Sequence, residues 1–314
     1  MVPIYIKYLG LEAYGLISFY TTLLVFLQIL DLGIYQTLIG EISRNILSTP
    51  KRVIATLFHS LAIINITIAI TIMLFFYLFS NWISSNWFSS NSYSKENLKE
   101  IIFLIGALIS VRWPILIYQG GLYGFQRISE ACFINISMVI LNNIGSFLIL
   151  FFFEPNIKNV FYWQIIIGFI YVIIIRYMFW RYFGVFERLS FSSALVKKIF
   201  KHASQMAGVT VTSITLTNID KIILSKIIPL NDFAIYMLAH NMSNILQIII
   251  NPIHNVLYPK FSQLFACKDY ESLSSLYSFS LKCLSIFIFP FSIMIFFSSY
   301  ELTLFYTQDD NLAS

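Results

Sequence analysis

The 314-residue chain is 58% hydrophobic and only 11% charged, whereas soluble domains are about 25% charged. A water-soluble fold of this size could not hide so much apolar surface, so the composition argues against a soluble enzyme and predicts that lipid is the solvent. Lys and Arg outnumber Asp and Glu by 20 to 15. These positive charges lie in short breaks between apolar runs, a placement that indicates membrane topology and not nucleic-acid binding.

The apolar runs predict an all-α polytopic membrane protein, because each is close to the roughly 20 helical residues that cross a bilayer. Met1 to Gly10 lacks the charged region and cleavage site of a signal peptide and is expected to be the tail of a helix. Eight spans are expected, at 14–35, 53–79, 101–123, 131–153, 160–181, 203–228, 232–258 and 279–299.

The distribution of positive charge predicts the orientation of these spans. Lys and Arg gather on one side, which is therefore expected to be cytoplasmic, with both chain ends outside. That side carries Arg44, Lys51, Arg52, Arg127, Arg176, Arg181, Arg188, Lys197, Lys198, Lys201, Lys260, Lys268 and Lys282.

The two longest connections have different predicted roles. The external one, 80–100, contains Trp82 and Trp87, which suit the interfacial aromatic belt. The cytoplasmic one, 182–202, contains FSSALVKKIFKHA and is predicted to hold a short helix lying on anionic lipid. It also supplies the expected boundary between an N-terminal lobe, 1–190, and a C-terminal lobe, 191–314.

Polar side chains recur at helical spacing within the spans. Lipid exposure of such a face would be costly, so a face with several polar groups indicates a hydrated cavity. Hydrogen bonds that pack one helix against another are the alternative for the Ser, Thr and Asn stripes. The clearest face consists of His240, Asn244, Gln247, Asn251 and His254, which fall within about 80° of arc. Five other spans carry one such face each: Thr21, Gln28, Asp31 and Tyr35; Thr56, Ser60, Thr67 and Thr71; Arg112, Gln119 and Tyr123; Asn135, Asn142 and Ser146; and Thr210, Ser213, Thr217, Asp220 and Lys221.

Arg112 is the most informative single residue, because a cation near the bilayer centre costs at least about 2.5–3.5 kcal/mol. No acid lies one turn away on the same helix. Either Asp31 or Glu41 pairs with it from another helix, or the guanidinium faces a cavity that receives an anion such as phosphate, whose oxygens match its donor fork.

Several ionisable groups are candidates for coupling transport to an ion. Asp220 and Lys221 could form an ion-coupling or substrate-handling pair, although Lys221 could also snorkel to the external interface. Asp31 could bind a proton if desolvation raised its pKa, or form a salt bridge. His240 and His254 titrate in the range that proton coupling needs.

The motifs of nucleotide, metal and nucleophilic chemistry do not occur in the sequence, which contains no GxxxxGK[ST], HExxH or nucleophile elbow. Cys132, Cys267 and Cys283 lack a CxxC pair or a His at ligand spacing, so neither a disulfide framework nor a metal site is predicted. We therefore expect no cofactor, and any transport would draw on an ion gradient or on the substrate gradient.

Four segments resemble the Wzx-type lipid-linked oligosaccharide flippases, of the superfamily that also contains the MATE exporters. They occur in family order: YLGLEAYGLISFYTTLLVFLQILDLG (8–33), RWPILIYQGGLYGFQR (112–127), LTNIDKIILSKIIPLNDFAIYMLA (216–239) and PIHNVLYPKFSQL (252–264). The resemblance implies a two-lobed bundle of usually twelve helices around a cavity. In that picture Arg112 is a cavity cation, and Asp220 and Lys221 occupy an LDK-like position.

The resemblance also implies a substrate and a location. Such proteins move undecaprenyl-diphosphate-linked repeat units across the bacterial inner membrane by alternating access, for O-antigen or another surface polysaccharide. A polysaccharide polymerase and a chain-length regulator are the implied protein partners. The eight spans would correspond to helices two to nine, so the resemblance predicts a chain truncated at both ends.

Three other interpretations are open at this point. A MATE-type cation-coupled drug exporter would need intramembrane carboxylates, for which Asp31 and Asp220 are the candidates. A membrane glycosyltransferase or polymerase would need long catalytic loops, and the 80–100 connection is too poor in charge for one. A truncated fragment could also be inactive.

Overall fold

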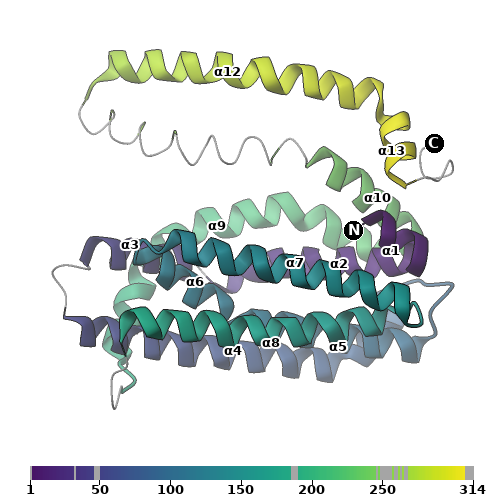
Figure 1. The fold of residues 1–314 in the computed structure, drawn as a ribbon, viewed down its shortest axis with the longest axis horizontal. Coiled ribbons are helices and arrows are strands. Elements are labelled where there is room, and N and C mark those ends of the chain that lie inside the picture. The colour runs from purple at the N-terminus through teal and green to yellow at the C-terminus, as the bar shows by residue number, and fades with distance from the viewer. Residues whose placement is uncertain are drawn as a thin grey trace. The chain divides into compact units, whose positions relative to one another are not determined.

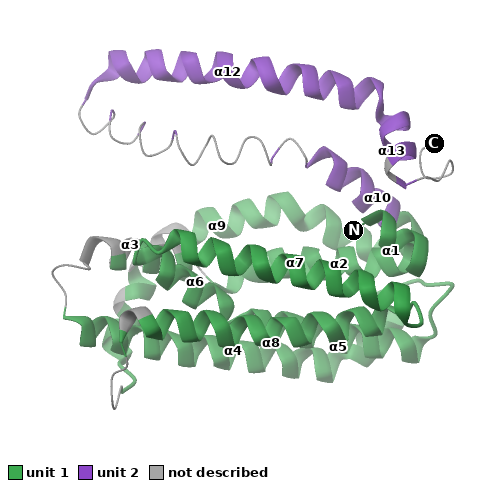
Figure 2. Ribbon diagram, viewed as in Figure 1, with its two compact units in different colours: residues 1–233 green, residues 234–314 purple. Residues whose placement is uncertain are grey.

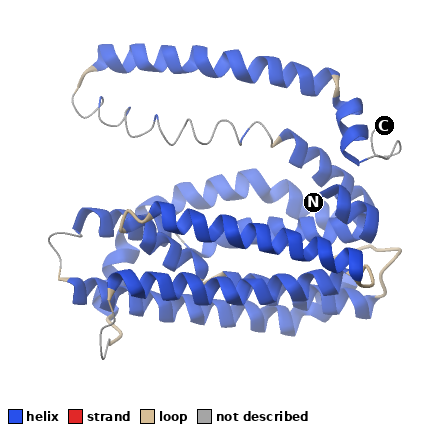
Figure 3. Cartoon of the chain, viewed as in Figure 1, coloured by secondary structure: helices blue, strands red, loops and turns tan. Residues whose placement is uncertain are grey.

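The computed structural model describes residues 2–31, 33–45, 50–184, 190–244, 247, 257, 261, 264 and 268–307. Over these residues the chain is built from helices and contains no strand (Figures 1 and 3), which confirms the all-α class. The helices are α1 (Val2–Leu9), α2 (Leu11–Leu27), the 3-10 helix η1 (Gln28–Asp31), α3 (Ile34–Asn45), α4 (Lys51–Asn86), α5 (Lys95–Arg112), α6 (Ile115–Gly124), α7 (Ile128–Phe152), α8 (Ile157–Phe183), α9 (Ser193–Ile227), α10 (Leu230–Ser243), α12 (Tyr270–Phe297) and α13 (Ser299–Thr307).

The helices form two compact units, Met1–Phe233 and Ala234–Ser314 (Figure 2). Helix α9 and the start of α10 belong to the first unit. In the second unit Asp269 caps α12, accepting a hydrogen bond from Ser272 N at 3.1 Å. Hydrogen bonds from the side chain and from the backbone N–H of Ser272 lower the pKa of Asp269. The expected lobe boundary after residue 190 stays a prediction.

Six stretches of the described chain are long and apolar enough to cross a membrane, so the protein is a multi-pass membrane protein. They are Leu11–Asp31, Lys51–Asn86, Lys95–Gly124, Ile128–Phe152, Ile157–Arg181 and Tyr270–Phe297, and each overlaps an expected span. The expected span 203–228 lies in α9, which is helical but more polar than these six. The span 232–258 begins in α10, and most of its second half lies outside the described residues.

Two of the expected spans are each broken into two helices. The first breaks at η1 and Gly33, whose φ of 76° suits glycine, and Asp31 then caps α3 by accepting a hydrogen bond from Tyr35 N at 3.0 Å. The second breaks after Arg112, because Pro114 has no N–H to donate and its ring crowds the preceding turn. Arg112 is therefore the last residue of α5 and does not lie in the middle of a helix.

The expectation of a separate surface helix in 182–202 is wrong. Helix α9 runs without a break from Ser193 to Ile227. Ile199 and Ala203 are fully buried in a core that also contains Leu38 and Leu61. Ile199 and Ala203 thus face protein, since α9 contacts α3 and α4.

Closely packed aromatic rings hold the centre of the first unit together. The rings of Phe58 (α4) and Phe179 (α8) lie 4.3 Å apart, beside Gly121 of α6. A Cβ at Gly121 would lie 2.5 Å from Phe179 and 2.6 Å from Phe58. The absence of a side chain at this position therefore lets α6 approach both rings.

The connection after α4 is shorter than predicted, because α4 continues to Asn86 and α5 begins at Lys95. With 36 residues, α4 is about 54 Å long and extends past the roughly 30 Å hydrocarbon layer. Only residues 87–94 form a loop between α4 and α5. Burial raises the pKa of its Tyr93, and the neighbouring Glu12 carboxylate raises it further.

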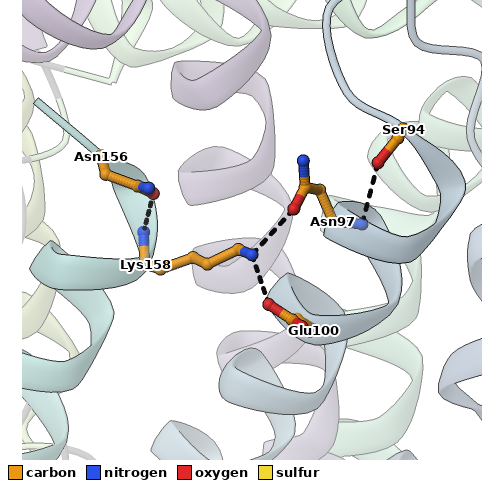
Figure 4. A network of polar contacts seen from close by, with 5 residues as sticks. All are labelled: Ser94, Asn97, Glu100, Asn156 and Lys158. Atoms are coloured by element: carbon orange, nitrogen blue, oxygen red, sulfur yellow. Dashed lines mark hydrogen bonds and ion pairs between the residues drawn. The ribbon is translucent and has the colours of Figure 1, made fainter.

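A polar network at the same end of the bundle joins α5 to α8 (Figure 4). The Lys158 ammonium forms an ion pair with Glu100 and donates to Asn97 Oδ1 at 2.8 Å. Ser94 and Asn156 cap the two helices, accepting hydrogen bonds from the backbone N–H groups of Asn97 and Lys158. This network fixes how the first turns of α5 and α8 meet.

Candidate functional site

The guanidinium of Arg112 is placed by a helix end. Since α5 stops at this residue, the cation lies at the carboxyl terminus of a helix, where the helix dipole favours positive charge. Its Cζ lies 5.9 Å from the centre of the Tyr20 ring on α2. Within the described residues no carboxylate lies at ion-pair distance from it.

The two acids proposed as partners of Arg112 do not supply a described ion pair. Asp31 is engaged with Tyr35 N at the start of α3. The side chain of Glu41 lies outside the described part of the structure. Of the two arrangements predicted for Arg112, the described residues therefore favour a cation that faces a cavity.

A cavity of about 130 Å³ lies beside Arg112, between α5, α7 and α8. Its polar walls are Asn135 and Asn142 from α7 and Tyr171 from α8, whose hydroxyl donates to Asn135 Oδ1 at 3.4 Å. Gly168 lets α8 approach α5, since a Cβ there would lie 3.0 Å from Val111. Three helices thus bring one cation and three neutral polar groups together.

Some buried polar atoms near the cavity have no hydrogen-bond partner within the described protein. Asn142 Oδ1 is one of them, and the Tyr20 hydroxyl beneath Arg112 is another. Trp163 Nε1 is a third, and it lies against Gly145, one turn along α7 from Asn142. Since an unpaired buried polar atom is costly, these atoms indicate that water or a ligand occupies this region.

The size of the cavity limits what it can hold. Ligand pockets usually measure about 300–1,000 Å³, and this one is smaller. It could take one small anionic group, such as a phosphoryl group, but not a whole sugar unit. A guanidinium suits such a group because its planar donors can contact two oxygens.

Gln119 and Asp31, two other predicted site residues, do not line this cavity. Gln119 Nε2 donates to the Tyr123 hydroxyl on its own helix, α6, at 3.0 Å. The threonine stripe of α4 is also satisfied locally, as the hydroxyls of Thr56, Thr67 and Thr71 each donate to a backbone carbonyl one turn back. Because these hydroxyls bond within α4 itself, the bonds neither join α4 to another helix nor indicate a hydrated cavity.

Asp220 and Lys221 lie on α9 and also do not line the cavity. Lys221 is only 5% exposed. Its ammonium donates to Asn218 Oδ1 at 3.0 Å and to the Thr217 carbonyl, both on the same helix. In this structure Lys221 is held within the bundle and does not snorkel.

The predicted histidine stripe is partly described, in the unit Ala234–Ser314. His240 Nε2 and Asn244 Nδ2 lie 2.7 Å apart, and the His240 ring stacks on Tyr236. Gln247 is exposed. Asn251 and His254 lie outside the described residues, so the stripe as a whole stays a prediction.

Tyr20 and Tyr171 are the site residues that the sequence reasoning missed. The polar faces expected from the sequence include Tyr35 and Tyr123 but neither of these two tyrosines. Spacing could have revealed Tyr171, because Gln164, Gly168 and Tyr171 follow one face of α8. No comparable signal exists for Tyr20, whose role depends on the approach of α5 to α2.

The sequence profile of the family described as "Polysaccharide biosynthesis protein" matches residues 1–265. No curated protein matches the chain.

Proposed function

The chain belongs to the polysaccharide biosynthesis protein family, whose members are transporters of the flippase type, and from this premise we propose that it flips lipid-linked oligosaccharides. The proposed substrate is an undecaprenyl-diphosphate-linked repeat unit of O-antigen or another surface polysaccharide. The proposed location is the bacterial inner membrane, where the protein would work by alternating access between the lobes 1–190 and 191–314. A polysaccharide polymerase and a chain-length regulator are the proposed protein partners.

The Arg112 cavity is the observation that carries this proposal. A lipid diphosphate must leave water while its prenyl chain stays in the bilayer, so the protein has to supply positive charge and hydrogen bonds at membrane depth. Arg112, Asn135, Asn142 and Tyr171 are groups of that kind, and their cavity suits one phosphoryl group. We assign the diphosphate to Arg112.

The remaining predicted polar residues are proposed to contact the glycan or a coupling ion. His240 and Asn244 already pair with each other, and a sugar hydroxyl could bond to either. Asp220 and Lys221 are proposed to act at a different stage of transport, since Lys221 is bonded within its own helix here.

A drug exporter of the MATE type is less well supported. Binding a cationic drug requires an available carboxylate at the site, but Asp31 is engaged in capping α3 and Asp220 does not line the Arg112 cavity. The cavity described above carries a cation, which would repel such a drug. The charge at the site therefore favours an anionic substrate.

Complementation tests the assignment of Arg112. In a strain that lacks its own O-unit flippase, the parent chain should restore surface polysaccharide, and Arg112→Ala should reduce the restored amount about 10- to 100-fold, the loss expected for a charged hydrogen bond. Arg112→Lys should retain part of the activity because it keeps the charge but not the donor fork. Surface polysaccharide would be measured by gel electrophoresis and staining.

Arg127→Ala is the control, because Arg127 is exposed and pairs with Glu130 three residues along α7. It should behave like the parent. Equal export by the parent and by Arg112→Ala, at equal protein levels, would contradict the assignment. Drug resistance without polysaccharide export would support the MATE alternative.

A further inference from the structure

A groove of about 560 Å³ lies between α2, α4 and α9, apart from the Arg112 cavity. Its walls are aliphatic and aromatic and include Phe19 and Leu23 of α2, Phe76 and Phe79 of α4, and Ile222 of α9. Its volume falls within the range of ordinary ligand sites. Walls of this chemistry cannot bond to a sugar or a peptide backbone, so the occupant must be a hydrocarbon chain.

One end of the groove carries a cation. Trp87 lines the groove where α4 ends, and its Nε1 donates to Ser225 Oγ at 3.1 Å. The Lys226 ammonium lies 5.3 Å from the centre of the Trp87 ring and is exposed. Within the described residues no carboxylate lies at ion-pair distance from Lys226.

The level of this end in the membrane follows from its side chains. Trp82 and Trp87 both line the groove, and tryptophan prefers the interface between hydrocarbon and headgroups. A lysine at that level is positioned to meet a lipid phosphate, since basic residues near the membrane surface attract anionic lipids. The apolar groove and the cation therefore match the two parts of one lipid molecule.

We propose that this groove is a binding site for an anionic glycerophospholipid, with one acyl chain along Phe76 and Phe79 and the phosphate at Lys226. A phosphodiester carries a single negative charge, which the single cation at this end would balance. The groove and the Arg112 cavity share no lining residue. The site is thus distinct from the proposed diphosphate site at Arg112.

Fluorescence quenching by brominated lipids tests the site in the purified full-length chain. The protein would be placed in phosphatidylcholine nanodiscs that contain phosphatidylglycerol or phosphatidylcholine with brominated acyl chains. Brominated phosphatidylglycerol should quench tryptophan emission at a lower mole fraction than brominated phosphatidylcholine. Trp82→Phe should remove part of this quenching, because Trp82 lines the groove.

Charge variants then test the headgroup contact. Lys226→Gln should lower the preference for phosphatidylglycerol about fivefold, the contribution of one lysine near a membrane surface. Lys95→Gln is the control, an exposed lysine at the start of α5 that does not line the groove. It should keep the preference of the parent.

Three results would overturn the proposal: equal quenching of the parent by both brominated lipids, an unchanged preference in Lys226→Gln, or displacement of phosphatidylglycerol by equimolar undecaprenyl phosphate. The last result would identify the occupant as a prenyl lipid. Because the assay measures lipid binding without transport, a negative outcome here leaves the complementation experiment unaffected.

Discussion

At the scale of single residues, Glu12 shows how a buried charge is accommodated. The residue is only 4% exposed, and its carboxylate accepts hydrogen bonds from Ser90 Oγ at 2.6 Å, Asn91 N at 2.9 Å and Ser92 N at 3.1 Å. Ser90 Oγ in turn accepts from Tyr93 N at 2.9 Å. Donors from the loop thus replace the water that burial removes.

Removing this carboxylate should destabilise the protein. In Glu12→Ala the Ser90 hydroxyl and the backbone N–H groups of Asn91 and Ser92 would lose a charged acceptor, and the free energy of unfolding should fall by about 1–3 kcal/mol. The thermal midpoint of the purified chain in detergent would report the change. Glu130→Ala is the control, since its partner Arg127 is exposed and such a pair contributes about 0–1 kcal/mol; midpoints lowered equally by both changes would refute the role of Glu12.

At the scale of single residues, the sequence predicted only part of the Arg112 site. Arg112 was identifiable because a cation inside an apolar run is rare, and Asn135 and Asn142 were identifiable from their spacing. The contact of Arg112 with Tyr20 depends on the packing of separate helices, which periodicity within one helix does not reveal. Glu12 was missed because its partners lie in a loop far along the chain.

At the scale of helices, glycine sets the distance between α4 and α5. A Cβ at Gly106 would lie 2.2 Å from the Cβ of Phe76, closer than atoms can approach. Small residues at such contacts are typical of helix pairs in membranes. Gly208 on α9 differs, since a Cβ there would meet no atom within 4 Å.

The two glycines therefore make a matched pair for substitution. Gly106→Ala should lower the free energy of unfolding by about 1–3 kcal/mol, because overpacking forces α4 and α5 apart. Gly208→Ala should leave it unchanged or raise it by up to about 1 kcal/mol, because alanine favours helix. Thermal unfolding in detergent would compare them, and a Gly106→Ala protein as stable as Gly208→Ala would disprove the close approach.

Helix positions were predicted better than helix breaks. Long apolar runs located the six membrane-crossing stretches because hydropathy averaged over a span is a strong signal. The same averaging concealed the breaks at Gly33 and Pro114, although both residues are visible in the sequence. The continuity of α9 was missed because Lys197, Lys198 and Lys201 suggested a surface helix, whereas Ile199 is buried among protein side chains.

At the scale of the whole molecule, the orientation in the membrane can be tested. The positive-inside rule places the loop 87–94 outside and Arg127 in the cytoplasm. In a background without native cysteines, Ser92→Cys should react with a membrane-impermeant maleimide added to spheroplasts, while Arg127→Cys should react only after lysis. The reverse pattern would show that the orientation is inverted.

The loop 87–94 is bonded to three helices, and this has a consequence for movement. It is bonded to α2 through Glu12, to α9 through Trp87 and Ser225, and to α10 through the hydrogen bond from Leu230 N to Ser89 O at 3.1 Å. If α9 swings away from α2 during transport, the last two bonds must break together. Each contributes about 1 kcal/mol, so a change as small as Ser225→Ala could alter how often the transporter opens on that side without touching its cargo.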